Sequence, residues 1–195
     1  MQHKVKLTVI DKKLYPELQA QYCKDPSAGA CPCYNVGDVF IFERYGAADD
    51  FWHIGFNSLR QTAYTAESIA GGTSFPHCSE AWDAISRYIY TGLQGGAIMR
   101  NWMDDERIMI ACCSDGTRPV IFKIERIDYK VMYITGISCE KCKEKIRTAL
   151  MQIENVKEVS FKEKWAEVTL EKEVEDAVLK SAAEAAGDYT VDKID

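Results

Sequence analysis

The chain has 195 residues, of which 47% are hydrophobic and 28% are charged, a balance typical of a folded globular protein. Its net charge of −6 and its pI of about 5.2 argue against a nucleic-acid-binding surface, which needs a net basic face. No apolar run approaches the roughly 18–20 residues that a membrane span requires. The N-terminus has no apolar signal region, so we expect a soluble cytoplasmic protein of one or two domains.

Cysteine is unusually frequent, with eight cysteines against only three histidines. Because the chain has no recognisable export signal and is long enough to build its own core, we expect its thiols to be reduced. Reduced thiols serve as metal ligands, as redox groups or as small core residues. The small number of histidines disfavours a His-rich zinc or copper(II) site.

The first part of the chain alternates short apolar segments with turn-rich ones. Alternating apolar residues predict a strand at 4–10, and a short helix is predicted at 14–23. A turn-rich segment at 25–33 then leads toward a buried strand that contains Phe42. Residues 46–76 have weak periodicity, and we expect a partly helical excursion or a lid there.

A longer helix and a hairpin follow this excursion. Ser79 is the expected N-cap of the helix, whose apolar residues recur at helical spacing as far as a Gly-Gly pair. Two strands, 107–113 and 119–127, flank a Ser-Asp-Gly-Thr turn and are predicted to form the hairpin. Together these elements predict an N-terminal α+β domain with antiparallel strands over residues 1–127.

The pattern changes near Asp128, where a second set of six elements begins. Strands and helices are predicted in the order β-α-β-β-α-β, at residues 129–135, 142–153, 156–161, 166–170, 174–182 and 189–194. This order predicts a ferredoxin-like βαββαβ domain over residues 129–195, with an antiparallel sheet and both helices on one face.

A CxxC motif lies between the first strand and the first helix of this second domain. Cys139 is expected in the loop and Cys142 in the first helical turn. The helix N-terminus carries a partial positive charge, which favours thiolates over thiols. Soft sulfur ligands favour Cu(I), with Zn(II) or another soft metal as the alternative. Two thiolates alone would leave a tetrahedral zinc site half empty.

Residues 129–195 resemble heavy-metal-associated domains, as found in copper chaperones and in the N-terminal modules of copper ATPases. The resemblance rests on the motif Gly-Ile-Ser-Cys-Glu-Lys-Cys, on the order of elements, and on Ala-Ala-Gly-Asp-Tyr-Thr-Val before the last strand. It implies that Cys139 and Cys142 bind the metal, with Ser138 in the same loop and Tyr189 near it. A copper-transport or other metal-receiving domain is the partner that it implies. Ile137 replaces the Met that the family often has, which leaves the choice of metal open.

A redox pair is the alternative interpretation of the motif. A thioredoxin-like domain fits poorly, because the flanking elements differ in order and the usual Trp before the pair is missing.

The six remaining cysteines allow a second metal or reactive-thiol site in the first domain. Successive residues of a strand face opposite sides, so at most one of the two adjacent cysteines on the 107–113 strand can join it. The candidates are Cys31, Cys33, Cys78, Cys112 and Cys113, with Cys23 and His77 in reserve. The alternative is that several of them are small buried hydrophobic residues.

Residues 1–127 also resemble an uncharacterised, cysteine-containing family of bacteria and archaea. The matching pieces are Cys-Pro-x-Tyr-x-Val-Gly-Asp, Cys-Ser-Glu-Ala-Trp-Asp-Ala-Ile and Ala-Cys-Cys-Ser-Asp-Gly-Thr-Arg-Pro-Val. This resemblance implies no particular activity.

The sequence as a whole thus predicts a two-domain protein whose C-terminal domain binds or transfers Cu(I). The alternative is a thiol- or metal-dependent enzyme, whose N-terminal domain acts on a small molecule while the C-terminal domain supplies or senses metal. A third hypothesis is a docking domain with a vestigial cysteine pair.

Overall fold

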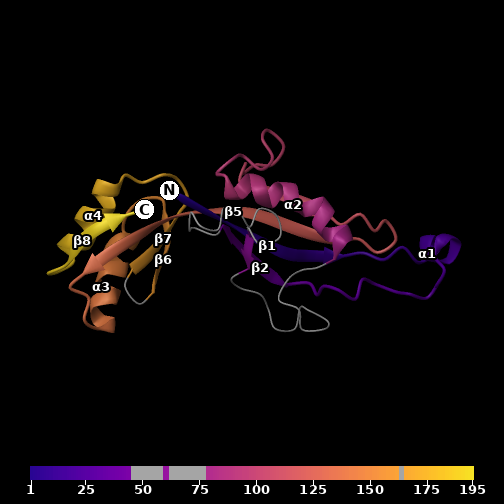
Figure 1. Ribbon diagram of the computed structural model, residues 1–195, viewed down its shortest axis with the longest axis horizontal. Coiled ribbons are helices and arrows are strands. Elements are labelled where there is room, and N and C mark those ends of the chain that lie inside the picture. Colours follow the sequence, from indigo (N-terminus) through magenta and orange to yellow (C-terminus); the bar gives the residue numbers. More distant parts are fainter. Residues whose placement is uncertain (45–58, 62–77, 163–164) are drawn as a thin grey trace. The chain divides into compact units, whose positions relative to one another are not determined.

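The computed structural model describes residues 1–44, 59–61, 78–162 and 165–195 (Figure 1). The chain divides into two compact units: a larger one of residues 4–126, and a smaller one that combines residues 127–195 with the first three residues. The excursion expected at 46–76 lies outside the described residues, apart from the short strand β3 (Leu59–Gln61).

The larger unit combines helices with antiparallel strands, as predicted. Its elements are β1 (Gln2–Lys12), α1 (Pro16–Tyr22), β2 (Val39–Arg44), β3, α2 (Ser79–Leu93), β4 (Ile108–Cys112) and the first half of β5 (Val120–Thr135). The strand order is β3-β2-β1-β5, and β4 also pairs with β5. The predicted hairpin is confirmed, since β4 and β5 pair antiparallel with Met109 opposite Ile124.

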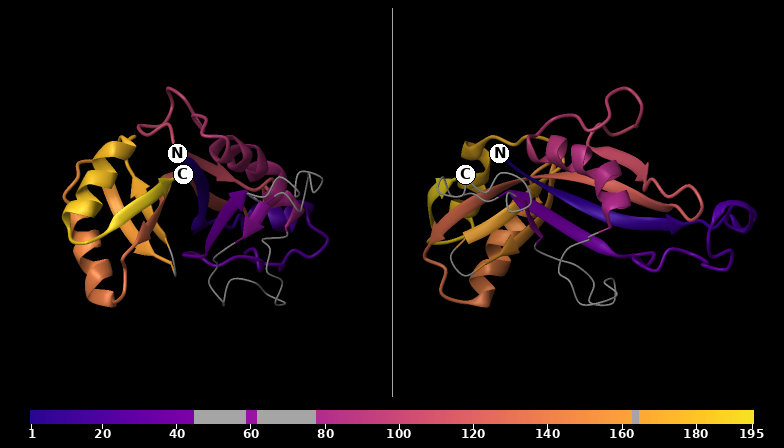
Figure 2. Two further views of the ribbon diagram at one scale, coloured as in Figure 1. Left: turned by 60° about the vertical axis from the view of Figure 1, so that its left-hand side comes forward. Right: turned by 45° about the vertical axis from the view of Figure 1, so that its right-hand side comes forward.

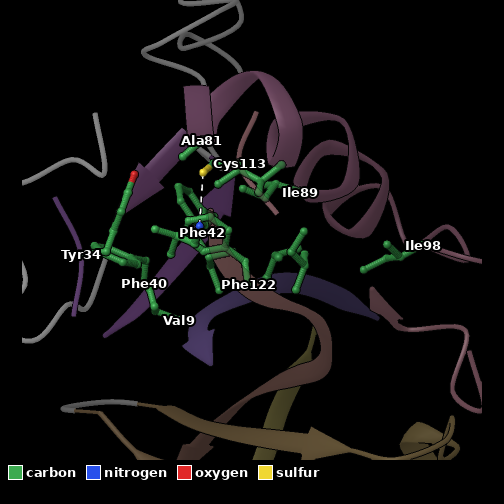
Figure 3. Close-up of a cluster of buried hydrophobic side chains, with 14 of the residues drawn as sticks. Val9, Tyr34, Phe40, Phe42, Ala81, Ile89, Ile98, Cys113 and Phe122 are labelled. Carbon is green, nitrogen blue, oxygen red and sulfur yellow. Dashed lines mark hydrogen bonds between the residues drawn. The ribbon is translucent and has the colours of Figure 1, made fainter. Parts of the chain in front are cut away.

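The core of the larger unit lies between α2 and the strands. The apolar face of β1, formed by Val5, Leu7 and Val9, is completely buried, in agreement with the alternation in the sequence. Figure 3 shows the buried side chains of this core, in which Phe42 of β2 and Phe122 of β5 lie beneath the helix. These contacts hold α2 against the sheet, so the start of the helix is a fixed point of the unit.

Close packing of α2 on β1 depends on Gly92. A Cβ atom at this position would lie 2.6 Å from Cγ2 of Val5 and 3.2 Å from Cδ1 of Ile98. Both of these side chains are buried, so neither has open space into which to move. Glycine is therefore required here by the closeness of the helix to the strand.

We expect Gly92→Ala to destabilise the protein by about 1–3 kcal/mol, because the added methyl group overpacks the core. Helix propensity alone predicts the opposite sign, since Ala is about 1 kcal/mol better than Gly inside a helix. Urea unfolding of the two proteins measures the difference. Gly116→Ala is the matched control, because a Cβ there meets no atom within 4 Å. A stabilised Gly92→Ala variant would show that the helix does not approach the strand so closely.

β5 is one continuous strand, whereas the sequence predicted two strands that meet near Asp128. The predicted break was wrong because the polar residues at this point are buried and paired, so the strand continues through them. The Asp128 carboxylate lies 2.7 Å from Nδ1 of His3. Lys130 donates through Nζ to the Val174 carbonyl at 2.7 Å and to the Asp176 carboxylate at 2.5 Å. Buried polar groups with such partners are compatible with an uninterrupted strand.

The smaller unit is built from the second half of β5 and five further elements. They are α3 (Glu140–Met151), β6 (Val156–Phe161), β7 (Trp165–Leu170), α4 (Asp176–Ala185) and β8 (Thr190–Ile194). β5 lies between β8 and β7, β6 pairs with the outer side of β7, and all three pairings are antiparallel. Figure 2 shows α3 and α4 side by side on one face of these strands. Ile146 and Leu150 of α3 and Leu179 of α4 are completely buried in the core between them.

Among the described residues, no helix combines the length and the apolar character that crossing a membrane requires.

Candidate functional site

The loop between β5 and α3 begins at Gly136, a position where no other residue fits. Gly136 has a φ of +91°, and a Cβ there would lie 2.5 Å from the carbonyl oxygen of Asp188. Side chains are strained at such a φ, and the carbonyl belongs to the backbone and cannot yield. Gly136 thus lets the loop before α3 lie directly against the loop before β8, which carries Tyr189.

The two cysteines of the CxxC motif come together at the start of α3. Cys139 is the N-cap residue, with extended backbone, and its carbonyl accepts a hydrogen bond from the Cys142 N–H at 3.0 Å. The two Sγ atoms are 2.9 Å apart. Cys139 is exposed and Cys142 is partly exposed, so both sulfurs can be reached from solvent.

Hydrogen bonds lower the pKa of the Cys142 thiol to about 6. The largest cause is the hydrogen bond from the Cys139 side chain, followed by bonds from the backbone and the hydroxyl of Ser138 and from the Tyr189 hydroxyl. Each bond stabilises the thiolate relative to the thiol. The sequence predicted the thiolate from the helix N-terminus, and these hydrogen bonds add a second, local cause.

Tyr189 contributes its hydroxyl because its ring is held in place by two glycines. A Cβ atom at Gly187 would lie 2.8 Å from Cε2 of the ring, and one at Gly136 would lie 3.5 Å from Cδ1. The hydrogen bond to the Cys142 thiolate is also the largest cause of the raised pKa of the Tyr189 hydroxyl. The hydroxyl therefore keeps its proton and acts as a donor, at the position that the family resemblance implied.

The donor set at this site suits a soft ion of low coordination number. In the described part of the chain, no group of three or more His, Cys, Asp or Glu residues that could hold a metal is found. With metal–sulfur bonds of about 2.3 Å, sulfurs 2.9 Å apart would enclose an angle of only about 80°. A metal ion held by both sulfurs would therefore require them to move apart.

In the larger unit, three of the predicted cysteines lie within electrostatic reach of one another. We call Cys31, Cys33 and Cys78 the thiol cluster. Burial of the Cys33 sulfur is the largest cause of its raised pKa, although the residue as a whole is exposed, and the charges of Cys31 and Cys78 raise it further. The Arg118 guanidinium lowers it in part. The sequence suggested these three residues as candidates, and the structure brings them to one place.

The two other predicted cysteines, Cys112 and Cys113, are not part of the thiol cluster, and they differ from each other in exposure. Cys113 is buried, and its sulfur accepts a hydrogen bond from the Val120 N–H at 3.3 Å. Cys112 is exposed, as expected for the next residue along a strand. The N-cap of α2 is Cys78, not Ser79 as predicted, and His77 lies outside the described residues.

Comparison of the chain with protein family models, with curated proteins and with solved structures finds no match in any of the three.

Iodoacetamide alkylation of Cys142 in the metal-free protein is expected to reach half its maximal rate near pH 6. Only the thiolate reacts, so the rate rises as pH passes through the lowered pKa and is nearly constant above neutrality. An ordinary thiol, with a pKa of about 8.5, is still mostly protonated there. Peptide mass spectrometry gives the rate for each cysteine. Cys139→Ala, which leaves no side-chain donor at this position, should move the half-rate pH upward, and an unchanged midpoint would contradict the role of Cys139 as the main donor.

We expect Tyr189→Phe to raise the half-rate pH of Cys142 by less than Cys139→Ala does, because the Tyr189 hydroxyl is a smaller cause of the shift. Phenylalanine keeps the ring that contacts Gly187, so the fold should be unchanged, as circular dichroism can check. Tyr133→Phe is the matched control, because Tyr133 is a half-exposed residue of the same unit whose ring faces Lys193. Equal effects of the two substitutions would show that no specific hydrogen bond reaches Cys142.

Proposed function

We propose that residues 129–195 form a ferredoxin-like heavy-metal-associated domain that binds Cu(I) between Cys139 and Cys142 and transfers it to a metal-receiving protein domain. The observation that supports this most is the pair of sulfurs 2.9 Å apart at the start of α3, one of them with a pKa of about 6. A thiolate that exists at neutral pH can bind a soft cation without first losing a proton.

The arrangement of the smaller unit supports the assignment of this fold. A β-α-β-β-α-β order with the first strand between the last strand and the third is the arrangement expected of a ferredoxin-like domain. In that arrangement the loop after the first strand and the loop before the last strand lie at the same end of the sheet. The contact between Gly136 and Asp188 is in agreement with this.

Cu(I) is preferred over Zn(II) because of the number of ligands. Two thiolates satisfy a soft monovalent ion, whereas zinc in structural sites takes four ligands. Two thiolates around one monovalent cation leave one net negative charge. The hydroxyls of Ser138 and Tyr189, which already bond to the Cys142 sulfur, are placed to stabilise that charge.

Transfer would proceed by exchange of thiolates. A thiolate of the receiving domain attacks the bound ion, a three-coordinate intermediate forms, and one of the two cysteines leaves. The leaving sulfur needs stabilisation as a thiolate, which the hydrogen bonds to Cys142 supply.

Anaerobic titration with Cu(I) against a competing chelator tests the assignment. The Cys139→Ser/Cys142→Ser double variant is expected to lose the tightest-bound equivalent of Cu(I), because two hydroxyls are poor ligands for a soft ion. The matched control is Cys23→Ser/Cys112→Ser, which removes the same number of thiols elsewhere and should keep that equivalent. An unchanged stoichiometry and affinity in the first variant would refute the proposal.

A further inference from the structure

The thiol cluster of the larger unit lies where a loop meets the start of α2. Cys31 and Cys33 are separated only by Pro32, and their side chains share a hydrogen bond. Cys78 is the residue immediately before α2, and its carbonyl accepts the hydrogen bond from the Trp82 N–H at 2.8 Å. The loop and the helix start are far apart in the sequence, so specific contacts must bring these sulfurs together.

Tyr34 provides one of those contacts. Its ring is buried and packs edge-on against Phe122, with the ring centres 5.3 Å apart (Figure 3). Its hydroxyl accepts a hydrogen bond from the backbone N–H of Cys78. Because Tyr34 directly follows Cys33, this side chain fixes the cysteine loop beside the first residue of the helix.

A second contact joins the helix start to the turn that carries Arg118. The backbone N–H of Ser114 donates to the Glu80 carbonyl at 3.2 Å, and the Ser114 hydroxyl bonds to the Glu80 carboxylate. Arg118 lies close enough to Cys31 and Cys33 for their charges to interact. Hydrogen bonds and ring packing therefore connect the loop, the helix start and the turn that surround the cluster.

The three sulfurs differ in access. Cys33 is exposed, whereas Cys31 and Cys78 are half-buried and pack against the core of the larger unit. No set of three metal-binding side chains is found among the residues that the structure describes. An exposed cysteine beside two half-buried cysteines is an arrangement that suits thiol–disulfide exchange, with an attacking thiol and a resolving thiol.

We propose that the thiol cluster is a thiol–disulfide exchange site, in which Cys33 reacts with a low-molecular-weight disulfide and then closes a reversible disulfide with Cys31 or Cys78. In the first step the Cys33 thiolate attacks one sulfur of the small disulfide RSSR. The bond between the two sulfurs of RSSR breaks, a mixed disulfide forms on Cys33, and the departing RS⁻ takes up the proton that Cys33 lost.

In the second step the thiolate of Cys31 or Cys78 attacks the Cys33 sulfur. The mixed disulfide breaks, the internal disulfide forms, and the second RS⁻ leaves with the proton of the resolving thiol. The two protein thiols are oxidised to one disulfide, and RSSR is reduced to two RSH. Glutathione disulfide is the probe of this chemical class, and excess reduced glutathione reverses the reaction.

The test uses the full chain with Cys139→Ser/Cys142→Ser, so that the CxxC pair can neither bind metal nor exchange disulfides. The protein is equilibrated with mixtures of reduced and oxidised glutathione, quenched in acid, alkylated and mapped by peptide mass spectrometry. We expect one internal disulfide per chain, always containing Cys33, while Cys23 and Cys112 remain alkylated thiols. Protein without a disulfide, or with disulfides that omit Cys33 or include the two outer cysteines, would overturn the proposal.

Further substitutions in the same background separate the roles of the three sulfurs. Cys33→Ser should abolish the internal disulfide, whereas Cys31→Ser and Cys78→Ser should each retain it with the remaining partner. Cys31→Ser/Cys78→Ser should accumulate a mixed disulfide of glutathione on Cys33, because no resolving thiol is left. Loss of the disulfide in Cys112→Ser would also overturn the proposal.

Circular dichroism identifies any variant that fails to fold. In that case the Cys139→Ser/Cys142→Ser protein with Cys33→Ala as its one further substitution repeats the test. The outcome does not depend on Cu(I) binding, so this proposal and the proposed function can fail separately.

Discussion

The first turn of α3 is the constraint on which the proposed metal site depends. The hydrogen bond from Cys142 N–H to the Cys139 carbonyl, at 3.0 Å, places the two residues on one turn, where side chains three positions apart are neighbours. Gly136 adds a second constraint, because its missing side chain lets the Tyr189 loop lie against the loop of the cysteines. The first contact brings the Cys139 sulfur to Cys142 and the second brings the Tyr189 hydroxyl, and both groups lower the pKa of Cys142.

The order of most elements in both units could be predicted from the sequence, because hydrophobic periodicity reports which residues face a core. The short strand β3 was not predicted. The alternation of Val5, Leu7 and Val9 is an example, and all three are buried. Periodicity does not report the partner of a buried polar residue. Asp128 looked like the end of a strand, but its carboxylate bonds to His3, 125 residues away in the sequence, and β5 continues through it. The division of the chain therefore lies within a strand.

The candidate metal site was predicted more completely than the thiol cluster, because its two cysteines are close together in the sequence. Cys139 and Cys142 are local to one helix start, so their spacing alone places them together. Cys33 and Cys78 are joined through the hydroxyl of Tyr34 and the packing of its ring on Phe122. No spacing or composition encodes such a contact, and residue type could only name Cys78 as a candidate.

The two thiol sites differ in the electrostatics that surround one sulfur. Cys142 receives hydrogen bonds from hydroxyl, thiol and backbone donors, which lower its pKa and prepare a thiolate for a cation. Cys33 is desolvated and lies beside two other thiols, which raise its pKa because neighbouring thiolates repel one another. A bound cation neutralises negative charge, whereas a disulfide removes it from both sulfurs at once. The two proposed roles, metal exchange in one unit and disulfide exchange in the other, therefore rest on the neighbours of the cysteines rather than on the cysteines themselves.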